Sequence, residues 1–280
     1  MPERSGQGRE YALGHSAEEL DRLSTQARLM EAFTRRVFEQ AGIGPGMKVL
    51  DIGSGAGDVA FLVREMVGPE GKIVGTDRAL EALRRSQERA AALGYSNVEF
   101  VQGDPVEMTF DEPFDALVGR FVLMYYPSPS GALGQLARHV RPGGIVAFQE
   151  SDNTGARTFP PQPLFDRLFE LMQKALEISK AEPRMALKLY PAFIAAGLPV
   201  PSMQAEVAVM GSQDPFVEPL ANFLVQGLRS MMPIIVKHGL ATEQGLDLDT
   251  YAQRLAEAFR AGGGIMMSPP FVGAWTRKAG

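Results

Sequence analysis

Two acidic residues and a group of glycines carry the clearest chemistry in this 280-residue chain. Asp51 ends an apolar stretch and is followed by glycine at positions 53, 55 and 57, while Asp77 ends a second apolar stretch. Glycine lets a backbone bend sharply and approach a ligand closely. A carboxylate about 20 residues after such a turn can accept hydrogen bonds from a ribose. The pattern therefore predicts a bound nucleoside.

Position 58 distinguishes between two kinds of nucleoside. In the dinucleotide fingerprint G-x-G-x-x-G, the third glycine packs the first helix beside a pyrophosphate. Counted from Gly53 and Gly55, that glycine is replaced by Asp58. A carboxylate there would repel phosphate, because helix N-termini bind anions through free N–H groups and a positive dipole end. A phosphate-free ligand, with an ammonium for Asp51 and a ribose for Asp77, fits better. The alternative is a tight strand-to-helix turn without a ligand.

The pattern D-x-G-x-G-x-G over residues 51–57 resembles the first motif of the class I S-adenosylmethionine-dependent methyltransferases. The stretch Arg141-Pro142-Gly143-Gly144 resembles the "RPGG" that precedes the fifth strand in that family. The likeness is greatest to small-molecule enzymes of the ubiquinone and menaquinone type, and covers residues 45–150 best. It implies S-adenosylmethionine as cofactor and S-adenosylhomocysteine as product.

Apolar segments alternate with helical patterns along the chain, which favours an α/β fold with a mostly parallel sheet. Five strands are expected near 47–52, 72–77, 97–102, 114–119 and 144–150, with helices near 58–67, 79–93 and 129–139. Further helices are expected near 164–180, 183–196, 216–238 and 248–261, and two strands near 203–210 and 264–278. The resemblance implies a Rossmann-like sheet of seven strands, flanked by helices. We therefore expect a helical cap (1–44), a cofactor-binding core (45–150) and a helical substrate lid that also holds the last two strands (151–280).

The resemblance also assigns cofactor-binding residues. It implies that the methionine part is wrapped by Gly53, Ser54, Gly55 and Gly57, and that Asp51 holds the ammonium. Asp77 would bind the ribose hydroxyls, with Arg78 beside the adenine. The remaining cofactor contacts implied are Gly103, Asp104 and Pro105 at the adenine amino group, Arg120 and Phe121 after the fourth strand, and Tyr11 at the methionine carboxylate.

Methyl transfer requires alignment and exclusion of water more than proton transfer, because a base is needed only for a protonated acceptor. The candidates for a catalytic group are His15, Tyr126 and Glu150, besides Asp152 and His238. The candidates on the substrate side are Met124, Tyr125, Tyr126, Arg229 and Met232. His139, near the end of a predicted helix, is expected to be structural.

Composition limits the possible partners. A net charge of −5 without a basic stripe argues against a nucleic-acid partner. There are no cysteines, and three scattered histidines predict no metal site. No apolar stretch reaches the length of a membrane span, so we expect a cytoplasmic protein, with a homodimer among the open oligomeric states. The expected function is methylation of a small, aromatic or apolar acceptor at O, N or C. The alternatives are aminopropyl transfer or a pericyclase on the same fold, a non-catalytic cofactor-binding protein, and an NAD-dependent oxidoreductase.

Overall fold

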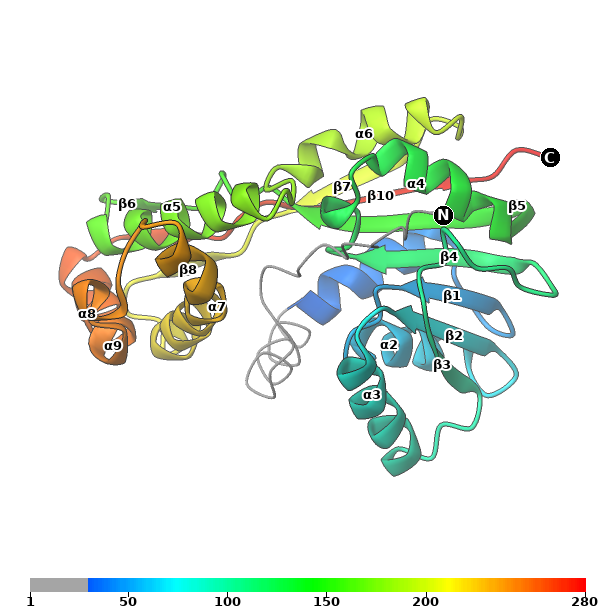
Figure 1. Ribbon diagram of the computed structural model, residues 1–280, viewed down its shortest axis with the longest axis horizontal. Helices are drawn as coiled ribbons and strands as arrows, with labels where there is room; N and C mark the ends of the chain where they lie inside the picture. Colours follow the sequence, from blue (N-terminus) through cyan, green and yellow to red (C-terminus); the bar gives the residue numbers. More distant parts are fainter. Residues whose placement is uncertain (1–29) are drawn as a thin grey trace, which may run out of the picture.

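The computed structural model describes residues 30–280, which form a central sheet with helices on both faces (Figure 1). The sheet has seven strands in the order β3-β2-β1-β4-β5-β10-β7. Its strands are β1 (Lys48–Ile52), β2 (Lys72–Asp77), β3 (Val98–Gln102), β4 (Phe114–Arg120), β5 (Val140–Ser151), β7 (Ser202–Glu206) and β10 (Phe271–Arg277). Neighbouring strands from β3 to β5 are parallel, and β10 runs antiparallel between β5 and β7. The expected Rossmann-like fold is confirmed.

Strand register brings the predicted acids to one edge of the sheet. Ile52 pairs with Thr76 of β2 and with Gly119 of β4, and Arg120 pairs with Gln149 of β5. Parallel strands share this edge at their carboxyl ends, where open α/β sheets bind ligands. Residues at the ends of β1, β2, β4 and β5 therefore surround one crevice.

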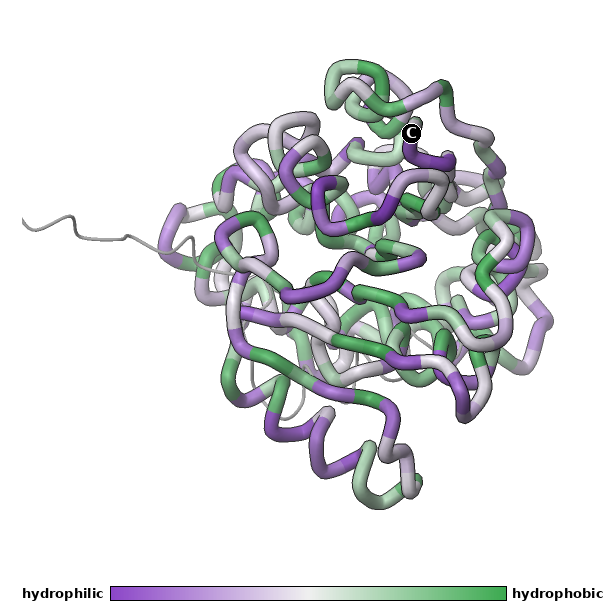
Figure 2. Tube along the Cα trace, turned by 90° about the vertical axis from the view of Figure 1, so that its right-hand side faces the viewer, coloured by the Kyte–Doolittle hydropathy of each residue, from purple (hydrophilic) through white to green (hydrophobic). Residues whose placement is uncertain are grey.

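Alternate residues of each strand bury against different helices, as the two-residue period of a strand requires. Val49 and Val118 pack with α2 (Asp58–Val67) and with helical residues 30–41. Leu117 and Phe148 pack instead with the opposite layer. That layer contains α4 (Pro129–Leu136) and α6 (Met185–Ala195), while α3 (Leu80–Ala92) joins the first layer. Hydrophilic and hydrophobic residues alternate along α3, at the bottom of Figure 2, because only one face of this helix is buried.

A second group of helices, called the lid below, lies beyond the carboxyl ends of the central strands, at the left of Figure 1. Its helices are α5 (Pro163–Ile178), α7 (Val217–Lys237), α8 (Glu243–Leu246) and α9 (Leu248–Gly262). They pack beside a second sheet, of three antiparallel strands: β6 (Arg157–Phe159), β9 (Ile265–Met267) and β8 (Val209–Gly211). Two short 3₁₀ turns, η1 (Leu123–Tyr125) and η2 (Ala137–His139), complete the elements described.

The last two predicted strands are wrong in one respect, because each divides between the two sheets. In the stretch near 203–210, β7 ends at Glu206 in the central sheet, and β8 begins at Val209 in the lid sheet. The stretch near 264–278 divides into β9 and β10 at Ser268-Pro269-Pro270. Proline lacks the N–H that a strand ladder needs, which explains the second break. Within residues 30–280, no helix is both long enough and apolar enough to cross a membrane.

The contact between β10 and the N-terminal helix gives a test of this packing. A Cβ atom added at Gly273 would lie 2.5 Å from a methyl carbon of Val37. We expect Gly273→Ala to lower the free energy of unfolding by about 1–3 kcal/mol, the usual cost of overpacking. Gly211→Ala in β8 is the control, because nothing lies within 4 Å of its added Cβ. Urea denaturation of both variants measures the difference, and equal stabilities would contradict this packing.

Candidate functional site

The turn between β1 and α2 has a shape that only glycine adopts readily. Gly53, Gly55 and Gly57 have φ values of 62°, 52° and 89°, in the left-handed region. Gly57 also forms the N-cap of α2, where an added Cβ would lie 2.8–2.9 Å from atoms of the Phe61 and Phe100 rings. The turn is therefore closely packed at Gly57, whereas nothing lies within 4 Å of a Cβ added at Gly55.

Asp51 is a buried carboxylate beneath this turn. The residue is 1% exposed, and neither of its carboxylate oxygens has a hydrogen-bond partner among residues 30–280. Burial raises the pKa of Asp51 well above its ordinary value, and the positive charge of Arg120 opposes that rise. Burying a carboxylate without a partner is costly. An ammonium group from a ligand would supply the missing partner.

Asp77 is held by main-chain groups on both sides of the crevice. One of its oxygens accepts a hydrogen bond of 2.9 Å from the N–H of Gly55, in the glycine turn. The other accepts a bond of 2.8 Å from the N–H of Ala79, at the start of α3. Because each carboxylate oxygen has further acceptor capacity, Asp77 can still receive hydrogen bonds from a pair of ribose hydroxyls.

Asp104 gathers two of the predicted residues into one cluster. Its carboxylate pairs with the guanidinium of Arg78 and accepts a hydrogen bond of 2.8 Å from the hydroxyl of Tyr126. Burial alone would raise the pKa of Asp104, but the bonds from Arg78, Val106 and Tyr126 hold it below its ordinary value. Burial and the Asp104 carboxylate raise the pKa of Tyr126. The Tyr126 hydroxyl is thus a donor in this cluster, not a base near neutral pH.

A second polar cluster lies between the sheet and the N-terminal helix. Thr34 donates a hydrogen bond of 2.7 Å to the side chain of Gln149 and accepts one of 3.2 Å from Arg120. Thr34 and Gln149 are fully buried. Sequence reasoning missed both, although each is a polar residue at an otherwise apolar position of its element. This cluster fixes the Arg120 side chain close to Asp51.

Glu150 is the other fully buried acid at this edge. One of its oxygens accepts hydrogen bonds from the N–H groups of Val122, at 3.0 Å, and Leu123, at 2.7 Å. The other oxygen has no partner among the described residues. Burial raises the pKa of Glu150 to about 8, against the pull of these backbone hydrogen bonds.

The remaining predicted residues lie in varied places. Gly103 donates its N–H to the carbonyl of Asp77, and the carbonyl of Pro105 contacts the buried ring of His139 at 2.7 Å, a structural position. Met124 and Tyr125 belong to η1, which begins at Leu123 and is followed by Tyr126. Met232 is buried in the packing of α7, and Arg229 forms an exposed ion pair of 3.1 Å with Asp249. Tyr11 and His15 lie outside the described residues.

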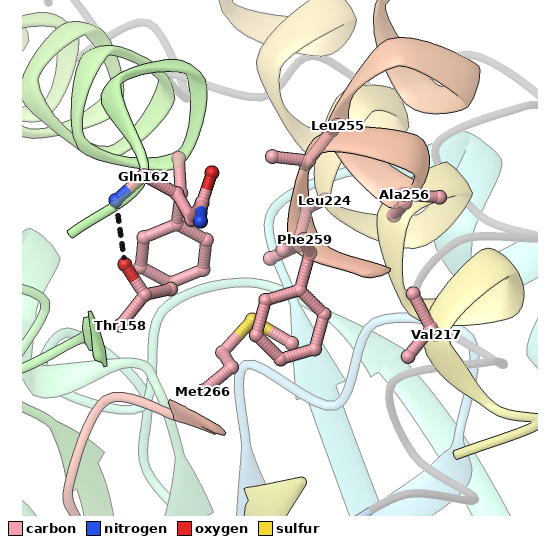
Figure 3. Close-up of a pocket in the computed structure, with 10 residues that line it drawn as sticks. Thr158, Gln162, Val217, Leu224, Leu255, Ala256, Phe259 and Met266 are labelled. Carbon is pink, nitrogen blue, oxygen red and sulfur yellow. Dashed lines mark hydrogen bonds between the residues drawn. The ribbon is translucent and has the colours of Figure 1, made fainter. Parts of the chain in front are cut away.

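The lid contains an apolar pocket of its own (Figure 3). It lies between α5, α7, α9 and the lid sheet, and its volume is about 10 Å³, roughly the space of one water molecule. Its walls are largely apolar, with Thr158 and Gln162 as the polar residues among Phe165, Val217, Ala221, Leu224, Leu255, Ala256, Phe259 and Met266. Across residues 30–280, no group of three or more acidic or histidine side chains is arranged to hold a metal ion.

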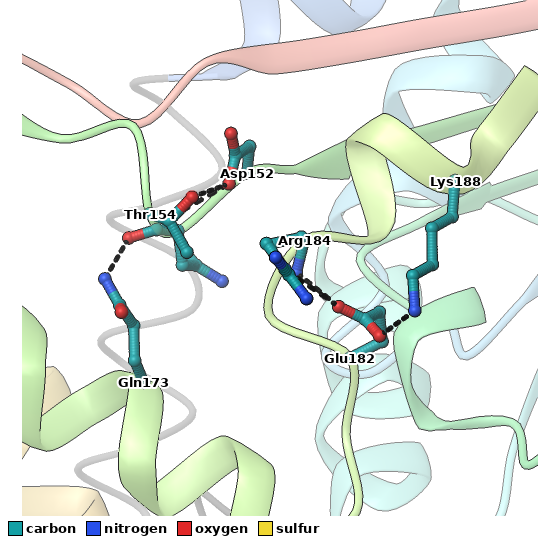
Figure 4. Close-up of polar contacts among 7 residues, drawn as sticks. Asp152, Thr154, Gln173, Glu182, Arg184 and Lys188 are labelled. Atoms are coloured by element: carbon teal, nitrogen blue, oxygen red, sulfur yellow. Dashed lines mark hydrogen bonds and ion pairs between the residues drawn. The ribbon is translucent and has the colours of Figure 1, made fainter.

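Polar contacts join the lid to the end of β5 (Figure 4). The side chain of Gln173, on α5, donates to the carbonyl of Asn153 at 2.8 Å. The N–H of Asn153 in turn donates to the carbonyl of Pro183, also at 2.8 Å. Glu182 pairs with Lys188 and donates its own N–H to the carbonyl of Met124 at 2.9 Å. The base of the lid is thus fixed directly to η1.

Comparison with known proteins agrees with this geometry. A protein-family model described as a methyltransferase domain matches residues 43–197. A demethylmenaquinone methyltransferase of Staphylococcus aureus is 31% identical over 145 residues, which cover 51% of this chain and 57% of the relative. The match therefore spans little more than half of that relative's length.

Solved structures show the same fold. The YcgJ protein from Bacillus subtilis superposes with a TM-score of 0.58 at 18% identity, covering 89% of this chain and 99% of that one. The [4+2]-cyclase SpnF superposes with a TM-score of 0.52 at 20% identity, covering 89% and 80%. The chain belongs to the class I S-adenosylmethionine-dependent methyltransferase family.

Glu150 gives a prediction about stability and pH. In the unfolded chain this carboxyl releases its proton near its ordinary pKa of 4.5, whereas in the folded protein it keeps the proton until about pH 8. Between these values the unfolded state binds fewer protons, so stability falls as pH rises. Between pH 5 and pH 8 we expect the free energy of unfolding of the wild type to fall by about 2–4 kcal/mol relative to that of Glu150→Gln. Urea denaturation at both pH values measures this, and a difference independent of pH would contradict the raised pKa.

Proposed function

We propose that this protein transfers a methyl group from S-adenosylmethionine to a small organic acceptor. The observation that carries the proposal is the buried carboxylate of Asp51, whose oxygens lack partners beneath a main-chain surface of left-handed glycines. A ligand with an ammonium group and no phosphate satisfies that carboxylate. The residues present therefore fit the cofactor of the family.

Each part of the cofactor has a residue suited to it. Asp51 would hold the ammonium group of the cofactor. Arg120, fixed by Thr34, would lie near the carboxylate of the cofactor's methionine part. Asp77 would receive the ribose hydroxyls while remaining bonded to the glycine turn. Arg78 and Asp104 would border the adenine. When bound, S-adenosylmethionine supplies a sulfonium methyl group, which is the reacting centre.

The protein's own contribution to the reaction is alignment and exclusion of water. Well-oriented reactants gain about 7–11 kcal/mol from such positioning. Met124 and Tyr125 belong to η1, next to Tyr126, and would face the acceptor. Because the hydrogen bond between Glu182 and Met124 joins η1 to the lid, movement of the lid would alter this surface.

We infer that the acceptor is aromatic or apolar. The side chains around the small lid pocket are largely apolar, and the 31% identical relative is named for a quinone acceptor, demethylmenaquinone. Arg229, the one cation among the predicted substrate residues, is paired with Asp249 and so has a partner other than a carboxylate on the acceptor. An acceptor without a carboxylate fits this arrangement.

Isothermal titration with S-adenosylhomocysteine tests the cofactor assignment. We expect wild type to bind, and Asp77→Ala to weaken binding about a hundredfold or more, because two charge-assisted hydrogen bonds are lost. Glu99→Ala is the control, since Glu99 forms an exposed ion pair with Lys72, 3.5 Å away, on the far part of the sheet.

Failure of wild type to bind S-adenosylhomocysteine would overturn the proposal. Transfer of a labelled methyl group to candidate phenols, indoles, quinols and amines, followed by mass spectrometry, tests the reaction itself. Cofactor binding combined with conversion of an acceptor without methyl incorporation would instead favour a non-methylating activity, such as that of the cyclase with the same fold.

A further inference from the structure

Glu150 is enclosed where three parts of the molecule meet. It lies near the end of β5, fully buried, and pairs in the sheet with Val272 of β10. One of its oxygens accepts the N–H groups of two consecutive residues, Val122 and Leu123. These residues directly follow the end of β4, so the carboxyl group holds the chain as it leaves the sheet.

The backbone at this point is in an unfavourable conformation. Phe121 has a φ of 54°, which a residue with a large side chain rarely adopts. Its own N–H donates to the carbonyl of Gln149 at 2.9 Å. Such conformations persist when the surrounding structure determines them. Gln149 and Glu150, consecutive on β5, supply three hydrogen bonds that do so.

Val122 connects this turn to the glycine-rich turn. A Cβ atom added at Gly53 would lie 2.6 Å from a methyl carbon of Val122, and one added at Gly119 would lie 2.8 Å from the other. The Val122 side chain therefore rests against bare main chain at the ends of both β1 and β4. Displacement of Val122 would leave Gly53 without its support.

We propose that Glu150 is a positioning residue, which sets the shape of the cofactor-binding glycine turn by holding Val122 against Gly53. This inference deepens the proposed function and rests on it for the identity of the ligand. It differs from the expectation that Glu150 is a catalytic base.

Two features of Glu150 support positioning over proton transfer. The residue has no exposed surface. Its bonded oxygen accepts the N–H groups of Val122 and Leu123, which follow the unfavourable backbone conformation at Phe121. A neutral acid or amide oxygen can accept these two hydrogen bonds as a carboxylate does. The role therefore requires an oxygen acceptor of this shape and not a negative charge.

The test compares variants that separate the oxygen from the charge. Glu150→Leu keeps the bulk but removes the acceptor, and we expect it to bind S-adenosylhomocysteine about tenfold more weakly or worse. Glu150→Gln keeps the acceptor, and we expect it to restore most of the affinity. Val122→Ala keeps Glu150 but removes the contact with Gly53, and we expect affinity to fall about threefold to tenfold.

Asp115→Ala is the matched control. Asp115 also accepts a backbone N–H, from Lys48 at 2.8 Å, but at the opposite edge of the same sheet. We expect this variant to lose stability in urea denaturation while its affinity for S-adenosylhomocysteine stays unchanged. A fall in affinity equal to that of Glu150→Leu would mean that the effect is general destabilisation, and would overturn the proposal.

Amide hydrogen exchange of residues 53–57 in the ligand-free protein provides a measurement independent of the cofactor. We expect faster exchange in Glu150→Leu and Val122→Ala, and no change in Glu150→Gln or Asp115→Ala. This result would stand even if wild type failed to bind S-adenosylhomocysteine, so the two proposals fail separately.

Two results contradict the positioning role directly. One is unchanged exchange and affinity in both Glu150→Leu and Val122→Ala. The other is a Glu150→Gln variant with normal cofactor KM but a kcat reduced about a hundredfold, which would identify Glu150 as a catalytic base.

Discussion

The burial of Asp51 without a partner is the constraint on which the site depends. A carboxylate enclosed at the end of β1 is costly without compensation, and its oxygens make no close hydrogen bond to the described residues, although the backbone of Ala60 is near enough to lower the pKa of Asp51 slightly. Arg120 is near enough to influence it but is bonded to Thr34. The protein thus keeps a buried acid without a hydrogen bond under its glycine turn, and a cationic group bound there would favour the ionised form of that acid.

The sequence predicted the parts of the fold that follow local rules. The first five strands and their helices obey the alternation of apolar and helical patterns, and the acids after β1 and β2 mark the ligand-binding edge. The division of the last two strands between two sheets was not predicted. That division depends on which partner strands are near, which no local pattern of residues records, although Pro269 and Pro270 gave a signal for one break.

The polar clusters show a similar limit. Asp51, Asp77 and Asp104 were identified because their types and spacing match a known motif. Thr34 and Gln149 were missed, since each supports Arg120 only after helix and strand are packed together. The pairing of Arg229 with Asp249 could not be foreseen either, because it depends on the contact between α7 and α9. The sequence thus predicted which residues matter at the motifs, but it did not predict the side-chain contacts between different helices and strands.

The position of β10 has a consequence for how the chain reaches its final form. Strand β10, which follows the lid along the chain, lies inside the sheet between β5 and β7, with Trp275 opposite Ala147. The chain therefore leaves the core for the lid after β5, returns at α6 and β7, and leaves again before β10. Pairings so distant along the chain are slow to form, since a long loop must close before they contribute. Until β10 is in place, the folding chain exposes the unpaired edges of β5 and β7.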